Sequence, residues 1–171
     1  MPIWIDCEAA KGRNRVMKIT RTMLVAVAVW LTAAAAVFAA NPHLGTWKLN
    51  ESKSKLVGGT KNNTVTYTEA KNGMMKLSVE GVDKDGKATH WTWEGKFDGK
   101  QYKVKGNTNM DTIAYEMVND RTNKFTGMKD GKIAVTGTIA VAKDGKSRVV
   151  TANDTDANGK KVTDKAYYDK Q

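Results

Sequence analysis

Six Asn-Gly or Asp-Gly pairs, each followed closely by a lysine, punctuate the chain between residues 72 and 159. They are Asn72-Gly73, Asp85-Gly86, Asp98-Gly99, Asp130-Gly131, Asp144-Gly145 and Asn158-Gly159. Tight turns between twisted strands need positive φ, which Gly adopts freely and which Asn and Asp tolerate. Successive glycines are 13, 13, 32, 14 and 14 residues apart, so each short interval holds one strand and the long one holds about three. The sequence therefore predicts a β-meander.

Apolar residues recur with a two-residue period between these turns, as expected for half-buried strands. The residues predicted to share the buried face are Trp47 and Leu49, Val65 and Tyr67, Met75, Leu77 and Val79, Trp91 and Trp93, Tyr102 and Val104, Ile113, Tyr115 and Met117, Phe125 on a short strand, and Ile133, Val135, Ile139 and Val141. The last two strands are expected over residues 146–152 and 161–168. The alternate positions are mostly Lys, Thr and Glu, so we expect one face of the sheet to be buried and the other to be exposed to solvent.

This pattern separates three all-β architectures. A membrane barrel would turn an apolar face to lipid, which the Lys, Glu and Thr positions exclude. A Greek-key sandwich needs long crossovers, whereas successive tight hairpins favour a single antiparallel up-and-down barrel of about eight to ten strands. We predict this barrel, with the sandwich as the alternative.

Residues 1–39 have the layout of an upstream extension followed by a secretory signal peptide. A basic lead precedes the apolar run Met23–Phe38, and Val37 and Ala39 occupy the −3 and −1 positions of a cleavage site. The signal is complete from Met17 onward. An uncleaved membrane anchor is the alternative, although 16 apolar residues are short for a span of about 20. Cys7 lies ahead of the apolar run, which disfavours a lipoprotein.

Cleavage after Ala39 leaves residues 40–171 as one domain. It removes five of 28 basic and two of 18 acidic residues, so the net charge becomes +7, and it removes the only cysteine. Such a domain relies on a continuous hydrophobic core, which a closed sheet supplies without exposed edges. We expect a monomeric protein that is secreted or periplasmic and is not stably inserted in a membrane after cleavage.

A resemblance is carried by the segment that opens this domain, His43-Leu44-Gly45-Thr46-Trp47-Lys48-Leu49. Gly-x-Trp on a first strand looks like the entry motif of the lipocalins, and residues 45–49 are similar to the first strand of the fatty-acid-binding proteins. Residues 44–170 as a whole resemble the small secreted lipocalin-like proteins of soil bacteria, which share the Gly-Thr-Trp-Lys-Leu-Asn start, a Lys-Ser-Lys segment and an end near Tyr-Asp-Lys. The resemblance implies a barrel that binds a small molecule.

The motif also has a physical interpretation as a structural plug. Gly45 lets a neighbour approach the backbone, and Trp47 is large enough to fill one end of a barrel while its indole N–H finds a backbone acceptor. In the families, a late-strand Arg packs over this Trp. Arg148 is the better of the two arginines in the domain for that position.

Two departures from the fatty-acid-binding proteins matter. Their helix pair after the first strand has no counterpart, because residues 51–63 are polar and contain Gly58-Gly59. Their carboxylate clamp resembles Arg-x-Tyr on the final strand, where this chain has Lys165-Ala166-Tyr167. Lys can hold a carboxylate but lacks the bidentate fork of Arg, and a solvent-exposed Lys165 is the alternative interpretation.

Metal, cofactor and catalytic sites find little support in the sequence. Asp154-x-Asp156-x-Asn158-Gly159 matches the start of a calcium loop, but position twelve is Lys165 instead of Glu, so we expect a hairpin turn. His43 and His90 do not have metal-ligand spacing, and by strand alternation His90 is expected on the exposed face. No nucleophile elbow is present, and Glu80, Glu94 and Glu116 fall on the exposed face. We expect a non-enzymatic protein without metal or cofactor.

The basic charge is dispersed over turns and outer strand positions, which gives no signal for specific nucleic-acid recognition. Two functions remain open. In the first, the barrel binds a small apolar or amphiphilic molecule such as a fatty acid, through Tyr67, Met75, Trp91, Trp93, Tyr102, Tyr115, Met117, Lys165 and Tyr167. In the second, the same side chains fill the barrel and the protein has a structural or interaction role in the cell envelope.

Overall fold

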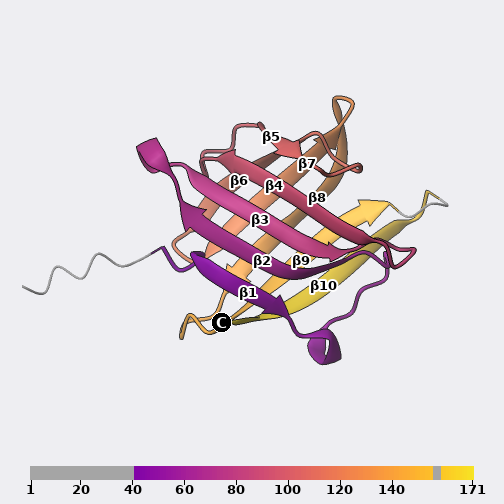
Figure 1. Ribbon diagram of the computed structural model, residues 1–171, viewed down its shortest axis with the longest axis horizontal. Helices are drawn as coiled ribbons and strands as arrows, with labels where there is room; N and C mark the ends of the chain where they lie inside the picture. Colours follow the sequence, from indigo (N-terminus) through magenta and orange to yellow (C-terminus); the bar gives the residue numbers. More distant parts are fainter. Residues whose placement is uncertain (1–40, 156–158) are drawn as a thin grey trace, which may run out of the picture. The chain divides into compact units, whose positions relative to one another are not determined.

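The computed structural model describes residues 41–155 and 159–171 and shows a closed antiparallel β-barrel (Figure 1). The strands are β1 (Gly45–Leu49), β2 (Lys61–Glu69), β3 (Met75–Val82), β4 (Ala88–Gly95), β5 (Tyr102–Lys105), β6 (Thr112–Asn119), β7 (Thr122–Lys129), β8 (Lys132–Val141), β9 (Ser147–Thr155) and β10 (Lys161–Lys170). Two 3-10 turns, η2 (Glu51–Lys53) and η3 (Lys71–Gly73), flank β2. The predicted leader, residues 1–39, lies outside the described residues.

Each strand pairs with its neighbours in the sequence, and β1 pairs with β10 to close the sheet. The closing register places Trp47 opposite Lys170 and Leu49 opposite Tyr168. The predicted up-and-down barrel is therefore confirmed, with ten strands, and the sandwich alternative is wrong. The segment between β1 and β2 contains only the short η2 helical turn, so the helix pair of the fatty-acid-binding proteins is absent from this described segment.

The turn between β7 and β8 shows why the Asn-Gly and Asp-Gly pairs predicted the hairpins. Asp130 and Gly131 have φ values of 49° and 73°, which give a two-residue turn the twist of its flanking strands. Positive φ values also occur at Gly73, Gly86, Gly99, Gly145 and Gly159. The long interval between Gly99 and Gly131 holds β5, β6 and β7, as the spacing predicted.

Three details of the strand prediction were wrong. The strand around Phe125 is not short, because β7 spans eight residues. Ile133 is 66% exposed, since a register shift between Gly127 and Met128 changes the pairing of β7 with β8 at that point. Met117 is 50% exposed, and it lies beside a second shift, where β6 reaches its turn to β7. A two-residue period does not reveal such irregularities.

Candidate functional site

The two ends of the barrel differ in how they are filled. Because the strands are antiparallel, the end where β1 starts also holds the ends of the even-numbered strands, and we call it the closed end. The opposite end, where β1 finishes, holds the ends of the odd-numbered strands and the starts of the even-numbered ones. We call this the open end.

Trp47 and Arg148 form the centre of the closed end. Trp47 is fully buried, and its Nε1–H donates to the carbonyl oxygen of His43 at 2.9 Å. Arg148 is 2% exposed, and its guanidinium carbon lies 4.7 Å from the ring centroid of Trp47 and 4.8 Å from that of Tyr168. The cation therefore faces aromatic rings, an arrangement that stabilises a charge away from water.

Gly45 completes this plug. Its φ is +104°, which side-chain-bearing residues rarely adopt, and a Cβ at this position would lie 3.0 Å from Cε of Lys170. Lys170 in turn places its Nζ 5.1 Å from the Trp47 ring centroid. This close packing is what the predicted structural plug requires.

His43 covers the plug and was not recognised from the sequence as a core residue. It is buried, and its Nε2 lies 3.2 Å from Nδ2 of Asn123, another buried residue that sequence reasoning missed. Burial, helped by the charges of Arg148 and Lys170, lowers the pKa of His43 to about 4. The imidazole is therefore neutral at physiological pH.

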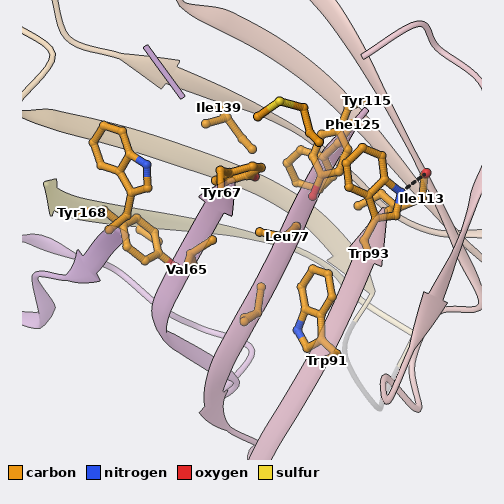
Figure 2. Close-up of a cluster of buried hydrophobic side chains, with 14 of the residues drawn as sticks. Val65, Tyr67, Leu77, Trp91, Trp93, Ile113, Tyr115, Phe125, Ile139 and Tyr168 are labelled. Atoms are coloured by element: carbon orange, nitrogen blue, oxygen red, sulfur yellow. Dashed lines mark hydrogen bonds between the residues drawn. The ribbon is translucent and has the colours of Figure 1, made fainter. Parts of the chain in front are cut away.

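A cluster of aromatic rings fills the interior next to the plug (Figure 2). Trp93 stacks on Phe97 with centroids 6.1 Å apart, and it meets Tyr115 edge-on at 4.9 Å. Its Nε1–H donates to the carbonyl oxygen of Ile113 at 3.2 Å. Burial raises the pKa of Tyr115 well above its usual value. This half of the barrel is occupied by its own side chains, as the filled-barrel hypothesis expects.

The inner wall toward the open end is different, because several inward-facing apolar residues there remain accessible to solvent. The half-buried members of this wall, which we call the open wall, are Leu49, Val104, Val135, Val150 and Ala152. Val150 lies between Ile139 and Ala166 in the sheet, and both of those partners are buried. The solvent that reaches Val150 is therefore not an effect of a frayed strand.

Small residues lie in the open wall, and the ring of Phe125 takes the space over one of them, Gly137. Gly137 pairs with Ala152, and Ala166 pairs with Val150. Trp91 lies near the middle of β4, two residues before Trp93, so it is nearer to this end of the barrel than Trp93 is (Figure 2). The open wall is the best candidate for a surface that holds an apolar molecule.

A strap crosses the barrel wall at the open end, and we define it as residues 54–60. β1 stops at Leu49, whereas β2 and β10 extend further, and the strap lies against β10 in the remaining space (Figure 1). The backbones of Lys55 and Lys165 exchange two hydrogen bonds of 2.8 Å. Oδ1 of Asp164 accepts from the N–H groups of Val57 and Gly58 at 2.5 and 3.1 Å. Leu56 packs against the core from this strap.

The structure divides the predicted ligand-binding residues into three groups. Tyr67, Met75, Trp91, Trp93 and Tyr115 are buried inside the barrel. Tyr102 is half-buried, and its hydroxyl donates to Asp98 at 3.0 Å. Met117 is 50% exposed, and Lys165 and Tyr167 lie on the outer face of β10.

The structure corrects the prediction that Lys165 and Tyr167 form a carboxylate clamp on β10. Lys165 and Tyr167 do share a face, and Nζ of Lys165 lies 5.4 Å from the Tyr167 ring centroid. That face points outward, because Ala166 and Tyr168 are the buried residues of this part of β10. These two side chains therefore cannot hold an acidic head group inside the barrel.

Residues 41–155 and 159–171 contain no group of three or more His, Cys, Asp or Glu side chains placed to bind a metal ion. Within the same ranges, no helix is long and apolar enough to cross a membrane. The calcium-like motif includes residues 156–158, which lie outside the described residues. His90 is exposed, as predicted.

Comparisons with known proteins give matches among solved structures. No family model matches the chain, and no curated protein matches it. Among solved structures, a redesigned β-barrel, mFAP1, bound to DFHBI, is similar with a TM-score of 0.43 and 13% sequence identity. The match covers 78% of this chain and 98% of that one. The fold of the present chain is defined by its own strand pairing.

Proposed function

We propose that this protein is an exported, non-catalytic barrel that binds a small apolar or amphiphilic molecule against the open wall. One observation carries the proposal: inward-facing apolar side chains such as Val150 and Ala152 keep contact with solvent, although they lie within the barrel wall. An apolar ligand would cover this surface, and removing it from water would contribute about 25 cal/mol of binding free energy per Å² of buried apolar area.

The chemistry of the wall favours an apolar body over an acidic head group. Lys165 faces outward, and the Nε and Nη1 atoms of Arg148 are buried behind aromatic rings. The inward-facing polar group nearest the strap is the carboxylate of Asp164, which would repel an anion. We therefore infer a neutral ligand or one whose acidic group stays outside the barrel.

The export proposal follows from the leader-like composition of residues 1–39. N-terminal sequencing of protein recovered from the periplasm or medium should begin at Ala40. Recovery of membrane-bound protein that retains residues 17–39 would support the anchor instead.

Titration with the neutral fluorescent probe N-phenyl-1-naphthylamine tests the binding function. We expect probe fluorescence to rise, Trp emission to change and the melting temperature to increase. Hexadecanol should displace the probe at least as well as hexadecanoate, and Lys165→Ala should leave both affinities unchanged.

Two tryptophan substitutions locate the site. Ala152→Trp places a large ring on the open wall and should abolish probe binding, whereas Ala140→Trp, at an exposed position on β8, should preserve it. Both variants must melt cooperatively for the comparison to count. If the wild-type protein changes neither fluorescence nor melting temperature with any of these ligands, the filled-barrel alternative holds.

A further inference from the structure

A groove of about 520 Å³ lies on the outer face of the sheet formed by β2 to β5, away from the barrel interior. Its floor is made of short hydroxyl-bearing side chains, among them Thr66, Ser78 and Thr92. Its borders include the long side chains of Lys76, Glu94, Lys103 and Lys105. The groove therefore arises from a contrast in side-chain length on an otherwise continuous sheet.

The floor residues form one row across the strands. The register pairs Thr46 with Thr66, Thr66 with Ser78, Ser78 with Thr92, and Thr92 with Lys105. Neighbouring strands are about 4.8 Å apart, so the row extends for about 19 Å. The hydroxyls of Thr46 and Thr66 lie 3.2 Å apart. A linear polymer lying along this row would meet one polar side chain per strand.

The groove carries an excess of positive charge. Three of its lining residues are lysines, against the single carboxylate of Glu94. Lys76 lies 3.8 Å from Glu94, but both side chains are exposed, and such pairs are weak. Lys103 and Lys105 form no ion pair within residues 41–155 and 159–171. Their charges are therefore available to an anion.

The groove chemistry favours one class of polyanion. Proteins that bind single-stranded nucleic acids stack bases on exposed aromatic rings, and Trp93, the aromatic residue among the groove residues, is only 2% exposed. The groove also lacks Arg, whose planar guanidinium binds phosphate through two hydrogen bonds. A row of hydroxyls bordered by ammonium groups complements a chain that carries both hydroxyls and carboxylates. We propose that this groove binds an acidic polysaccharide running across β2 to β5.

Charge substitutions inside and outside the groove test the proposal. Polygalacturonate is the probe, measured by calorimetry at low and moderate salt. The double variant Lys103→Gln/Lys105→Gln should weaken binding about fivefold or more, as expected for two lost, partly screened charge contacts. The matched variant Lys124→Gln/Lys161→Gln removes two exposed outer lysines elsewhere on the barrel and should weaken binding less than about twofold.

A second pair of variants separates shape from charge. Ser78→Tyr fills the groove floor without changing the charge and should weaken binding, whereas Thr138→Tyr, at an exposed position on β8, should not. Equal losses in the two lysine variants would overturn the groove as the site. Tighter binding of a single-stranded DNA oligomer through the same lysines would overturn the polysaccharide class. These outcomes are independent of ligand binding at the open wall.

Discussion

The ring of Trp47 contacts two cations, with the guanidinium carbon of Arg148 4.7 Å and Nζ of Lys170 5.1 Å from its centroid. The three residues belong to β1, β9 and β10, which are consecutive in the closed sheet. One aromatic side chain therefore connects the first strand to the last two.

Removing this ring should be costly. Trp47→Ala should lower the free energy of unfolding by about 3–5 kcal/mol, the usual range for emptying a buried Trp site. Urea titration measures the loss, and Tyr167→Ala, on the outer face of β10, is the control that should cost much less. A loss below about 1 kcal/mol for Trp47→Ala would contradict the plug.

Arg148 should matter more for its volume than for its charge. Its Nε and Nη1 atoms are buried without a hydrogen-bond partner among the described residues, and a buried charge can often be replaced by an apolar residue of similar size without loss. Arg148→Met should therefore be more stable than Arg148→Ala by about 2–5 kcal/mol, the cost of truncating a buried Met. Equal stabilities in denaturant titrations would show that the site collapses or that the charge dominates.

Acid should destabilise the barrel through His43. Its pKa is lowered to about 4 in the folded protein, from an ordinary value of 6.5. Between these two values the unfolded chain binds more protons, so the stabilisation is complete above pH 6.5 and decreases as the pH falls toward 4, by up to about 1.4 kcal/mol per pH unit. His43→Gln should flatten this part of the stability profile, and His90→Gln, at an exposed position, should not. A profile that His43→Gln leaves unchanged would assign the acid sensitivity to other groups.

The strap should loosen when Asp164 is removed. Hydrogen bonds to a charged acceptor contribute about 1.5–3 kcal/mol each, so Asp164→Ala should accelerate amide exchange at Val57 and Gly58 more than tenfold. Asp111→Ala, which removes the carboxylate that accepts from the Asp130 N–H at 2.8 Å, is a matched control at another loop. Faster uptake of the naphthylamine probe in Asp164→Ala alone would identify the strap as the entrance. Unchanged exchange at both amides would show that the backbone pairing of Lys55 with Lys165 is sufficient to hold it.

The turns and a range of eight to ten strands were predictable because they depend on local chemistry. A pair such as Asp130-Gly131 favours a tight turn, and other pairs, such as Asp85-Gly86 and Asp98-Gly99, mark longer connections between strands. Strand alternation then places Trp47, Tyr67, Trp93 and Tyr115 on one face, and burial confirms that placement.

The incorrect predictions concern residues whose burial depends on contacts with distant parts of the chain. Alternation puts Lys165 and Tyr167 on one face of β10, but it does not say which face, and the buried Ala166 is too small to have signalled the answer. Met117 and Ile133 lie beside register shifts that depend on the partner strand. Phe97 lies between β4 and β5, outside any strand period, although it contacts Trp93, Tyr67 and His43. Only spatial proximity identifies it as a core residue.

Pairing of the first strand with the last has a consequence for biosynthesis. The side chains of Asn50 and Asp169, which join β1 to β10 through a 2.7 Å hydrogen bond, are 119 residues apart in the chain. Contacts this distant form late and slow the folding of a domain. A polypeptide growing from its N-terminus therefore cannot close the barrel around Trp47 until β9 and β10 have been synthesised.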